Sequence, residues 1–308
     1  MNMNRRTTAL LTAGIVGLGL TGCSNYGGDE DGGGSGGGPG EGKTITMGYL
    51  PSWSDGLSMA YLMENQLEEM GYEVEHEELN DAAVIYAGLD NGDIDMYPSA
   101  WPEETHKEYA AEYEGGFEDV GAYYDNATLN LSVPTYMEDI NSIEDLVGQG
   151  DRFGGTIYGI EPGAGLTANT QDSVMPEYGL DGEYELSTSS TTSMLTELKN
   201  KTENEEDVLV TLWTPFWANT TYPVKALEDP RGAYPDPESL HFLGAEGFAE
   251  DFPEAAEWIS EVKLTDEQYG ELENLVVNEY DEGEEAEAVQ QWIDDNPDVL
   301  PELPEAED

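Results

Sequence analysis

The stretch Val208–Trp217, VLVTLWTPFW, predicts a buried strand that ends in a group of aromatic side chains. Its first half is apolar apart from one threonine, which is typical of a parallel strand covered by helices on both faces. Pro215 cannot donate to a sheet hydrogen bond, so Trp213, Phe216 and Trp217 come at or just past the carboxyl end of the strand. In open α/β sheets ligands bind at this edge. Two interpretations fit the rings, a ligand site and ordinary core.

The charge of the chain is extreme, with 67 Asp plus Glu against 10 Lys plus Arg and a formal net charge of -57. Such a surface repels nucleic acid and anionic lipid, which disfavours a polyanionic partner. The carboxylates either attract cationic ligands or adapt the surface to molar salt, and their spread along the chain favours salt. At about 1 M salt the Debye length is roughly 3 Å, so their mutual repulsion is largely screened. The hydrophobic content of 38% in 308 residues is enough for one large or two medium domains.

The first segment, residues 1–22, is predicted to be a targeting signal rather than part of the fold. Arg5 and Arg6 precede an apolar run over residues 8–20, which is shorter than the ~20 apolar residues of a membrane-spanning helix. The run leads into Leu-Thr-Gly-Cys at residues 20–23, which resembles a bacterial lipobox. The paired arginines resemble a twin-arginine export signal.

Cys23 is the only cysteine in the chain, so an intrachain disulfide and a cysteine-based metal site are excluded. We predict that Cys23 carries a lipid after signal cleavage, the alternative being an incidental cysteine in an uncleaved signal. Residues 24–42 are almost only Gly, Asp, Glu, Ser and Pro, which predicts a flexible tether with a reach of roughly 25 Å. We therefore predict that the folded part of the chain is lipid-anchored on the extracytoplasmic face of the cell membrane, with residues 23–42 as its anchor and tether.

The body begins at Lys43, and its pattern predicts an α/β fold of alternating strands and helices. Asp55 is expected to cap the first of these helices. Besides the opening stretch, the expected strands are 43–50, 72–78, 94–97, 129–133, 156–160 and 184–187, and the expected helices begin near residues 57, 81, 103, 142, 166 and 191. After a Pro-rich loop, three amphipathic helices are expected at 253–262, 266–280 and 284–294, with Trp258 and Trp292 in the core.

Three tryptophans, Trp53, Trp101 and Trp213, occupy equivalent places in this pattern. Each follows a short strand, at the edge where the strand gives way to a helix. A set of converging rings suits a cation that has no proton to donate, because aromatic faces carry a negative quadrupole. The pattern therefore predicts a cation cage at this edge.

A glycine-rich turn, Gly-Ile-Glu-Pro-Gly-Ala-Gly at residues 159–165, leads into a helix that starts near Leu166. Glycines let the backbone approach a ligand, and the free N–H groups at a helix N-terminus favour an anion. The spacing is not GxGxxG and no GKT or GKS follows, so we do not read it as a nucleotide loop. A tight structural turn is the alternative interpretation.

In combination, these motifs resemble the substrate-binding proteins of ABC importers for glycine betaine, proline betaine and related quaternary amines. The resemblance extends from Ile45 to about Asn296. It rests on SAW at residues 99–101, VPTYM and INSIEDL within 133–146, GIEPGAG at 159–165, the Ser/Thr run with Met194, and VTLWTPFW with the YPVKALEDPRG that follows. It implies a bilobal periplasmic-binding-protein fold of type II, in which two α/β lobes joined by a hinge close on the ligand. Lobe I would hold residues 43–132 and 233–308, and lobe II residues 133–232.

The resemblance also implies which residues hold the ligand. In this family three tryptophans box the trimethylammonium group, and they fall here on Trp53, Trp101 and Trp213. The backbone N–H groups that hold the ligand carboxylate fall on Gly165 and Leu166. A cation cage and an anion site would therefore lie side by side.

Phe216 departs from the family pattern, because relatives have a histidine at this place in WxPHW that donates to the ligand carboxylate. Loss of such a charge-assisted hydrogen bond typically costs about 1.5 to 3 kcal/mol, roughly ten- to a hundredfold in affinity. Either another donor, such as Thr214 or Ser52, takes over, or the ligand depends less on a carboxylate, as choline does. Phe216 as a fourth wall of the cage, and so a ligand-binding residue, is a further interpretation.

The sequence thus predicts a receptor that captures a quaternary ammonium compatible solute, foremost glycine betaine, and delivers it to a membrane permease and its ATPase. No catalysis, cofactor or metal is expected. The rivals are a choline or carnitine receptor of the same transporter class, a structural surface lipoprotein and an extracellular hydrolase. The hydrolase is disfavoured because the chain has no GxSxG and no HExxH, and because none of His76, His106 and His241 is expected beside the site.

Overall fold

The computed structural model describes residues 38–304. The predicted signal at residues 1–22, Cys23 and most of the tether lie outside this range. The described residues form one compact unit. Gly40, which the prediction assigns to the tether, contacts the body, since its N–H donates to the Met70 carbonyl at the end of the first helix, at 3.1 Å. Among the described helices, none has the length and apolar character needed to cross a membrane.

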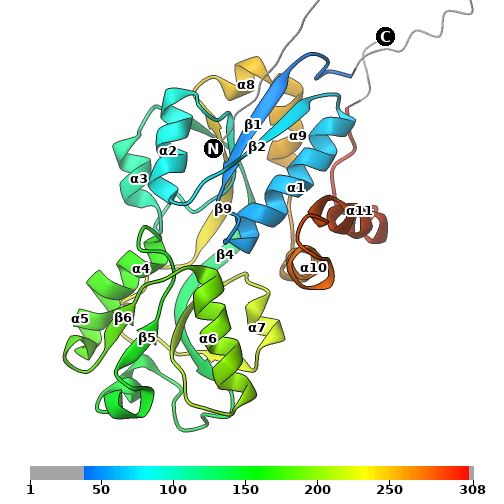
Figure 1. Cartoon of the computed structure of the whole chain (residues 1–308). Helices are drawn as coiled ribbons and strands as arrows, with labels where there is room; N and C mark the ends of the chain where they lie inside the picture. Colours follow the sequence, from blue (N-terminus) through cyan, green and yellow to red (C-terminus); the bar gives the residue numbers. More distant parts are fainter. Residues whose placement is uncertain (1–37, 305–308) are drawn as a thin grey trace, which may run out of the picture. The chain divides into compact units, whose positions relative to one another are not determined.

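The strands follow one another in the order β2-β1-β3-β9-β4-β7-β5-β6, with β8 paired to β4 (Figure 1). The first part of the sheet consists of β1 (Thr44–Tyr49), β2 (Glu73–Glu78), β3 (Met96–Ala100) and β9 (Glu238–Ala245). The long strand β4 (Phe117–Pro134) joins it to the second part, which consists of β5 (Thr156–Tyr158), β6 (Glu185–Ser187), β7 (Val210–Thr214) and β8 (Val224–Ala226). We call the first part with its helices lobe I and the second part with its helices lobe II.

Helices surround both parts of the sheet (Figure 1). Lobe I carries α1 (Ser54–Glu69), α2 (Ala82–Asn91), α3 (Lys107–Glu112), α8 (Phe248–Asp251) and α9 (Pro253–Glu261), and against α1 pack α10 (Asp266–Asn274) and α11 (Glu285–Asp295). Lobe II carries α4 (Gly165–Asn169), α5 (Met175–Tyr178), α6 (Thr191–Glu203) and α7 (Ala218–Thr221). As expected, Trp258 and Trp292 in the C-terminal helices are buried.

Strand β4 links the two lobes, and the sequence predicted only its last third. It pairs with β9 as far as Ala127 and with β7 from Thr128 onward, and its pairing with β9 is interrupted by register shifts. Asn126 beside this point has a φ of 67°, a left-handed conformation that asparagine tolerates. The change of partner therefore falls before the predicted lobe boundary at residue 132, and the boundaries at 132 and 232 stay predictions.

The opening stretch of sequence is strand β7, which is antiparallel to β4 and parallel to β5. The predicted parallel pairing is therefore found on one side of the strand only, because the other side pairs with the strand that links the two lobes. The strand ends at Thr214, as the proline at 215 requires. Trp213 consequently lies at the carboxyl end of β7, close to the start of α4.

Candidate functional site

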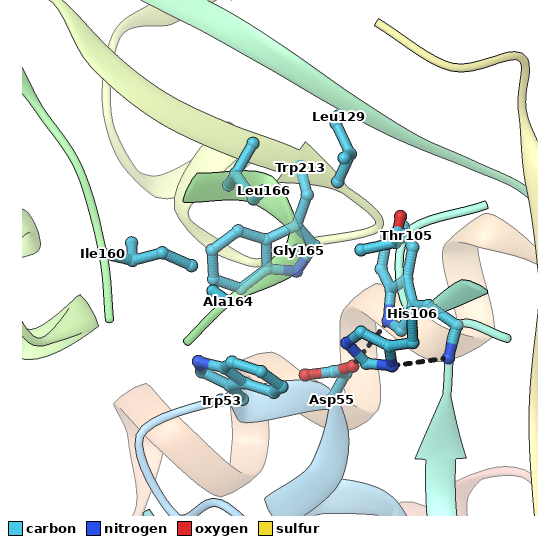
Figure 2. A pocket seen from close by; sticks show the side chains of 11 residues that line it. Trp53, Asp55, Thr105, His106, Leu129, Ile160, Ala164, Gly165, Leu166 and Trp213 are labelled. Atoms are coloured by element: carbon cyan, nitrogen blue, oxygen red, sulfur yellow. Dashed lines mark hydrogen bonds between the residues drawn. The ribbon is translucent and has the colours of Figure 1, made fainter. Parts of the chain in front are cut away.

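A small cavity lies where the carboxyl ends of β1, β3 and β7 approach the start of α4 (Figure 2). It brings together five of the six residues that the sequence proposed for ligand binding, namely Trp53, Trp101, Gly165, Leu166 and Trp213. The other residues that line it are Asp55, Thr105, His106, Leu129, Ile160 and Ala164. Both lobes therefore contribute to one shared site.

The three tryptophan side chains are buried, each at most 7% exposed, and present their rings to this cavity. Figure 2 shows the rings of Trp53 and Trp213 on opposite sides of a gap. The Trp53 Nε1–H donates to Glu161 at 3.0 Å, and the Trp101 Nε1–H donates to Asp55 at 3.1 Å. Since these bonds lie in the plane of each indole, they do not occupy the ring faces that border the cavity.

Phe216, the sixth proposed residue, does not line this cavity. Its ring stacks on Trp213 with the ring centres 3.9 Å apart and an interplanar angle of 16°. It lines a neighbouring cavity together with Trp217 and Tyr222. This placement does not fit a fourth wall of the cage; Phe216 supports Trp213 from behind.

Asp55 is a site residue that the sequence assigned to the wrong role. Helix α1 begins one residue earlier, so Trp53 holds the N-cap position and Asp55 lies in the first turn, 2% exposed, against the cavity. Its Oδ2 accepts hydrogen bonds from the Ser99 hydroxyl at 2.7 Å and from Trp101. Burial raises the pKa of Asp55 above its ordinary value, although these two hydrogen bonds oppose the rise. A cation in the cage would favour the ionised form.

His106 also lines the cavity, so the expectation that no histidine lies beside the site is wrong. Its ring stacks on Trp53, with the ring centres 6.0 Å apart and an interplanar angle of 17°. Burial lowers the pKa of His106 to about 3, so the imidazole is neutral at physiological pH. The Trp101 backbone N–H donates to Nδ1 at 3.3 Å, which assigns the proton to Nε2.

Figure 2 shows the second ring nitrogen of His106 on the side of the Trp53 and Trp213 rings, opposite the dashed bond to Trp101. His106 therefore offers an N–H donor to the cavity. The only signal in the sequence was its place in the loop a few residues after Trp101, at the end of β3. The sequence pattern does not identify such a residue, because the geometry of the loop decides where its side chain points.

Backbone N–H groups complete the site at the start of α4. Gly165 is the first residue of this helix, and Ala164 before it provides no side-chain cap. The first N–H groups of a helix have no intrahelical acceptor and attract anions. A Cβ on Gly165 would lie 2.2 Å from the carbonyl oxygen of Thr105 in lobe I, so only glycine permits this approach of the lobes. The site thus combines aromatic faces, a carboxylate, an imidazole N–H and open backbone N–H groups.

Two α/β lobes that share a long strand and enclose such a cavity define a solute-binding protein that closes on its ligand. The chain belongs to the family described as the substrate-binding domain of the ABC-type glycine betaine transport system, whose sequence model matches residues 43–295. Members of this family bind a transport substrate and are not enzymes. The predicted family and the predicted fold class are confirmed.

Three relatives illustrate the similarity. The glycine betaine, L-proline ABC transporter binding protein ProX of Borrelia burgdorferi is 30% identical, with a TM-score of 0.77 over 84% of this chain and 97% of that one. Lactococcal OpuAC, solved in its closed form with glycine betaine, is 28% identical, with a TM-score of 0.75 over 83% of this chain and 96% of that one. The glycine betaine/carnitine transport binding protein GbuC of Listeria monocytogenes is 34% identical over 151 residues. That alignment covers 49% of this chain and 49% of GbuC, about half the length of the curated relative.

Proposed function

We propose that this chain is the extracytoplasmic solute-binding lipoprotein of an ABC importer for quaternary ammonium compounds, with glycine betaine as its main ligand. One observation carries the proposal: a single cavity holds three tryptophan rings beside a set of N–H donors, from His106, Gly165 and Leu166. Glycine betaine has a permanent cation next to a carboxylate. The rings match its cationic end and the donors match its anionic end.

The strength of these contacts is sufficient for a transport receptor. A desolvated cation–π contact contributes up to about 2 kcal/mol, and a hydrogen bond to a charged group about 1.5 to 3 kcal/mol. A micromolar complex needs a binding free energy of roughly 8 kcal/mol. Contacts with three rings and a few N–H groups can supply this after the free energy lost on association is subtracted. His106 is the donor that compensates for Phe216, since neither Thr214 nor Ser52 lines the cavity.

The membrane part of the proposal rests on sequence alone. A lipid on Cys23 would hold the body near its permease and ATPase, because a tether of this composition reaches roughly 25 Å. The net charge of -57 fits a cell surface in molar salt, where import of a compatible solute protects against osmotic stress.

Choline is the second candidate ligand, and Asp55 is the observation that favours it. Choline has a hydroxyl in place of the carboxylate, and a buried carboxylate in the cavity can accept a hydrogen bond from that hydroxyl. Carnitine, which has both groups, belongs to the same alternative. The cage is common to all three ligands, so the donors and Asp55 decide among them.

Tryptophan fluorescence titration in molar salt tests the proposal, with glycine betaine, proline betaine, carnitine, choline and proline as ligands. A saturable change with the betaines supports the main assignment. A response to choline alone keeps the cage and moves the assignment to an alcohol-bearing cation. No response, with no ligand-induced shift in thermal unfolding, would leave a structural surface lipoprotein as the better reading.

A further inference from the structure

Glu161 of lobe II accepts hydrogen bonds from both lobes, and it is only half-buried beside the cavity. From lobe I, the Ser52 hydroxyl donates to Oε1 at 2.9 Å and the Trp53 Nε1–H donates to Oε2 at 3.0 Å. From lobe II, the Thr191 N–H donates to Oε1 at 2.9 Å and the Thr191 hydroxyl donates to Oε2 at 2.8 Å. Each carboxylate oxygen therefore receives one donor from each lobe.

The two pairs of bonds have different consequences. Thr191 and Glu161 belong to the same lobe, so their bonds aim the carboxylate and persist when the lobes separate. The bonds from Ser52 and Trp53 cross between the lobes and exist only in the closed form. One of the crossing donors is the indole N–H of a cage tryptophan, so the same bond also fixes the Trp53 ring against the cavity.

A second carboxylate holds the residue that follows Trp53. Glu273 of α10 accepts from the Ser54 hydroxyl at 2.7 Å and from the backbone N–H of Trp217, in lobe II, at 2.8 Å. The segment Ser52–Trp53–Ser54 is thus bonded to carboxylates on both sides. Glu273 is fully buried whereas Glu161 is not, so Glu161 is the one that can be exchanged with less risk to folding.

We propose that Glu161 is a positioning residue that couples the Trp53 ring to lobe closure and thereby sets the rate of ligand release. Glu161 touches no ligand atom in this proposal; it acts through Trp53 and Ser52. The proposal rests on the function proposed above, since it assumes that the cavity binds a quaternary amine. Because crossing bonds form after the ligand has docked, their loss accelerates dissociation and leaves association nearly unchanged.

Stopped-flow tryptophan fluorescence on the purified full chain tests this, with glycine betaine and choline as probes. Glu161→Gln replaces one carboxylate oxygen by an NH2 group, which cannot accept the hydrogen bond that this oxygen receives. Ser52→Ala removes one crossing bond and leaves the cage tryptophans unchanged. We expect dissociation to accelerate about tenfold in Glu161→Gln and severalfold in Ser52→Ala, with association within about twofold of the original chain. In the double variant the two effects should not add, because both remove the same contact.

Glu185→Gln is the matched control, since it removes the same charge from an exposed position on β6 of lobe II. Unchanged dissociation in both Glu161→Gln and Ser52→Ala, or an equal acceleration in Glu185→Gln, overturns the proposal. Small-angle X-ray scattering at saturating glycine betaine gives an independent readout, because Glu161→Gln should increase the radius of gyration and Glu185→Gln should not. If the original chain binds neither probe, the proposed function fails, whereas normal binding with unchanged dissociation in both variants overturns the role of Glu161 alone.

Discussion

The two walls of the cavity are built in different ways. In the lobe I wall, Trp101 donates to Asp55, Asp55 accepts from Ser99, and the Ser99 hydroxyl shares a hydrogen bond of 2.8 Å with the Tyr123 hydroxyl. In the lobe II wall, the buried Nε1 of Trp213 has no partner among the described residues. Trp101 and Asp55 are therefore held by bonds within lobe I, where the His106 Nε2–H stays open to the cavity, whereas the Trp213 N–H of lobe II lacks an acceptor among the described residues.

The difference indicates an order of events. A prearranged wall binds with little further loss of conformational freedom, so we infer that the ligand docks first on lobe I. The unpaired N–H groups of lobe II, from Trp213 and from the start of α4, gain their acceptors only when the lobes close on it. Changes to the lobe I wall should therefore weaken capture, and changes to the lobe II wall should weaken closure.

The largest effect is expected from Trp101→Ala. This change removes a cage ring and also strips Asp55 of a donor, so affinity for glycine betaine should fall about a hundredfold or more. Trp213→Ala removes a ring whose N–H donates to no acceptor among the described residues, so affinity for glycine betaine should fall about tenfold. Isothermal titration calorimetry measures both, and circular dichroism checks that the variants fold. An equal or larger loss in Trp213→Ala would contradict the contrast between the walls.

Gly165→Ala should come next, with a loss of affinity of more than about tenfold. The added Cβ would meet the Thr105 carbonyl oxygen at 2.2 Å and hold the lobes apart. The control is Gly182→Ala in the same lobe, where a Cβ meets no atom within 4 Å. Fluorescence titration of both variants separates the two cases, and normal affinity in Gly165→Ala would mean that the lobes bind ligand without this close approach.

Substitutions at positions 106 and 216 test which residue donates a hydrogen bond to the ligand carboxylate. His106→Phe should weaken glycine betaine about tenfold and choline less than about threefold, because only the first ligand uses the Nε2–H as a carboxylate donor. Phe216→His restores the family histidine but should change glycine betaine affinity less than about threefold, since this position lies behind Trp213. A large gain in Phe216→His would show that the bound form places residue 216 at the ligand.

The smallest effect concerns stability rather than affinity. Burial, aided by the charge of Asp55, raises the pKa of Glu273 from its ordinary value of 4.5 to about 8, despite the opposing hydrogen bond from Ser54. A carboxyl with a raised pKa in the folded state binds its proton more tightly there, so its contribution to stability is complete below about pH 4.5 and is lost as the pH rises through about 8.

Urea unfolding of Glu273→Gln in molar salt at pH 5, 6.5 and 8.5, chosen around the two pKa values, should therefore show a shallower decline of stability than the original chain. Glu271→Gln, exposed on the same helix, is the control that should keep the original slope. Identical pH profiles for all three proteins would be incompatible with the raised pKa.

The sequence predicted the parts of the site that follow strand ends. Trp53, Trp101 and Trp213 could be placed because strand patterns are local and their carboxyl ends share one edge. Asp55 was misassigned since Asp before Gly and Leu is a common cap, and only the observed start of α1 puts it inside. His106 was missed because a loop, rather than a periodic element, orients it.

Strand β4 shows the same limit for the fold. Its first part, FEDVGAYYDNA, does not alternate between apolar and polar residues, because its pairing with β9 contains register shifts and a residue at positive φ. Its last part alternates regularly and was predicted. A link between lobes is therefore harder to find in sequence than the lobes themselves.

The unpaired indole N–H of Trp213 also makes the protein its own spectroscopic reporter. Six tryptophans give six indole proton resonances in a region of the NMR spectrum that is free of backbone signals, and three of them belong to the cage. The Trp53 proton is bonded to Glu161 of lobe II, so its chemical shift depends on lobe position, whereas the Trp101 proton is bonded to Asp55 within lobe I. The Trp213 proton has no acceptor among the described residues, so we expect its resonance to shift when a ligand fills the cavity beside its ring, without a label on the ligand.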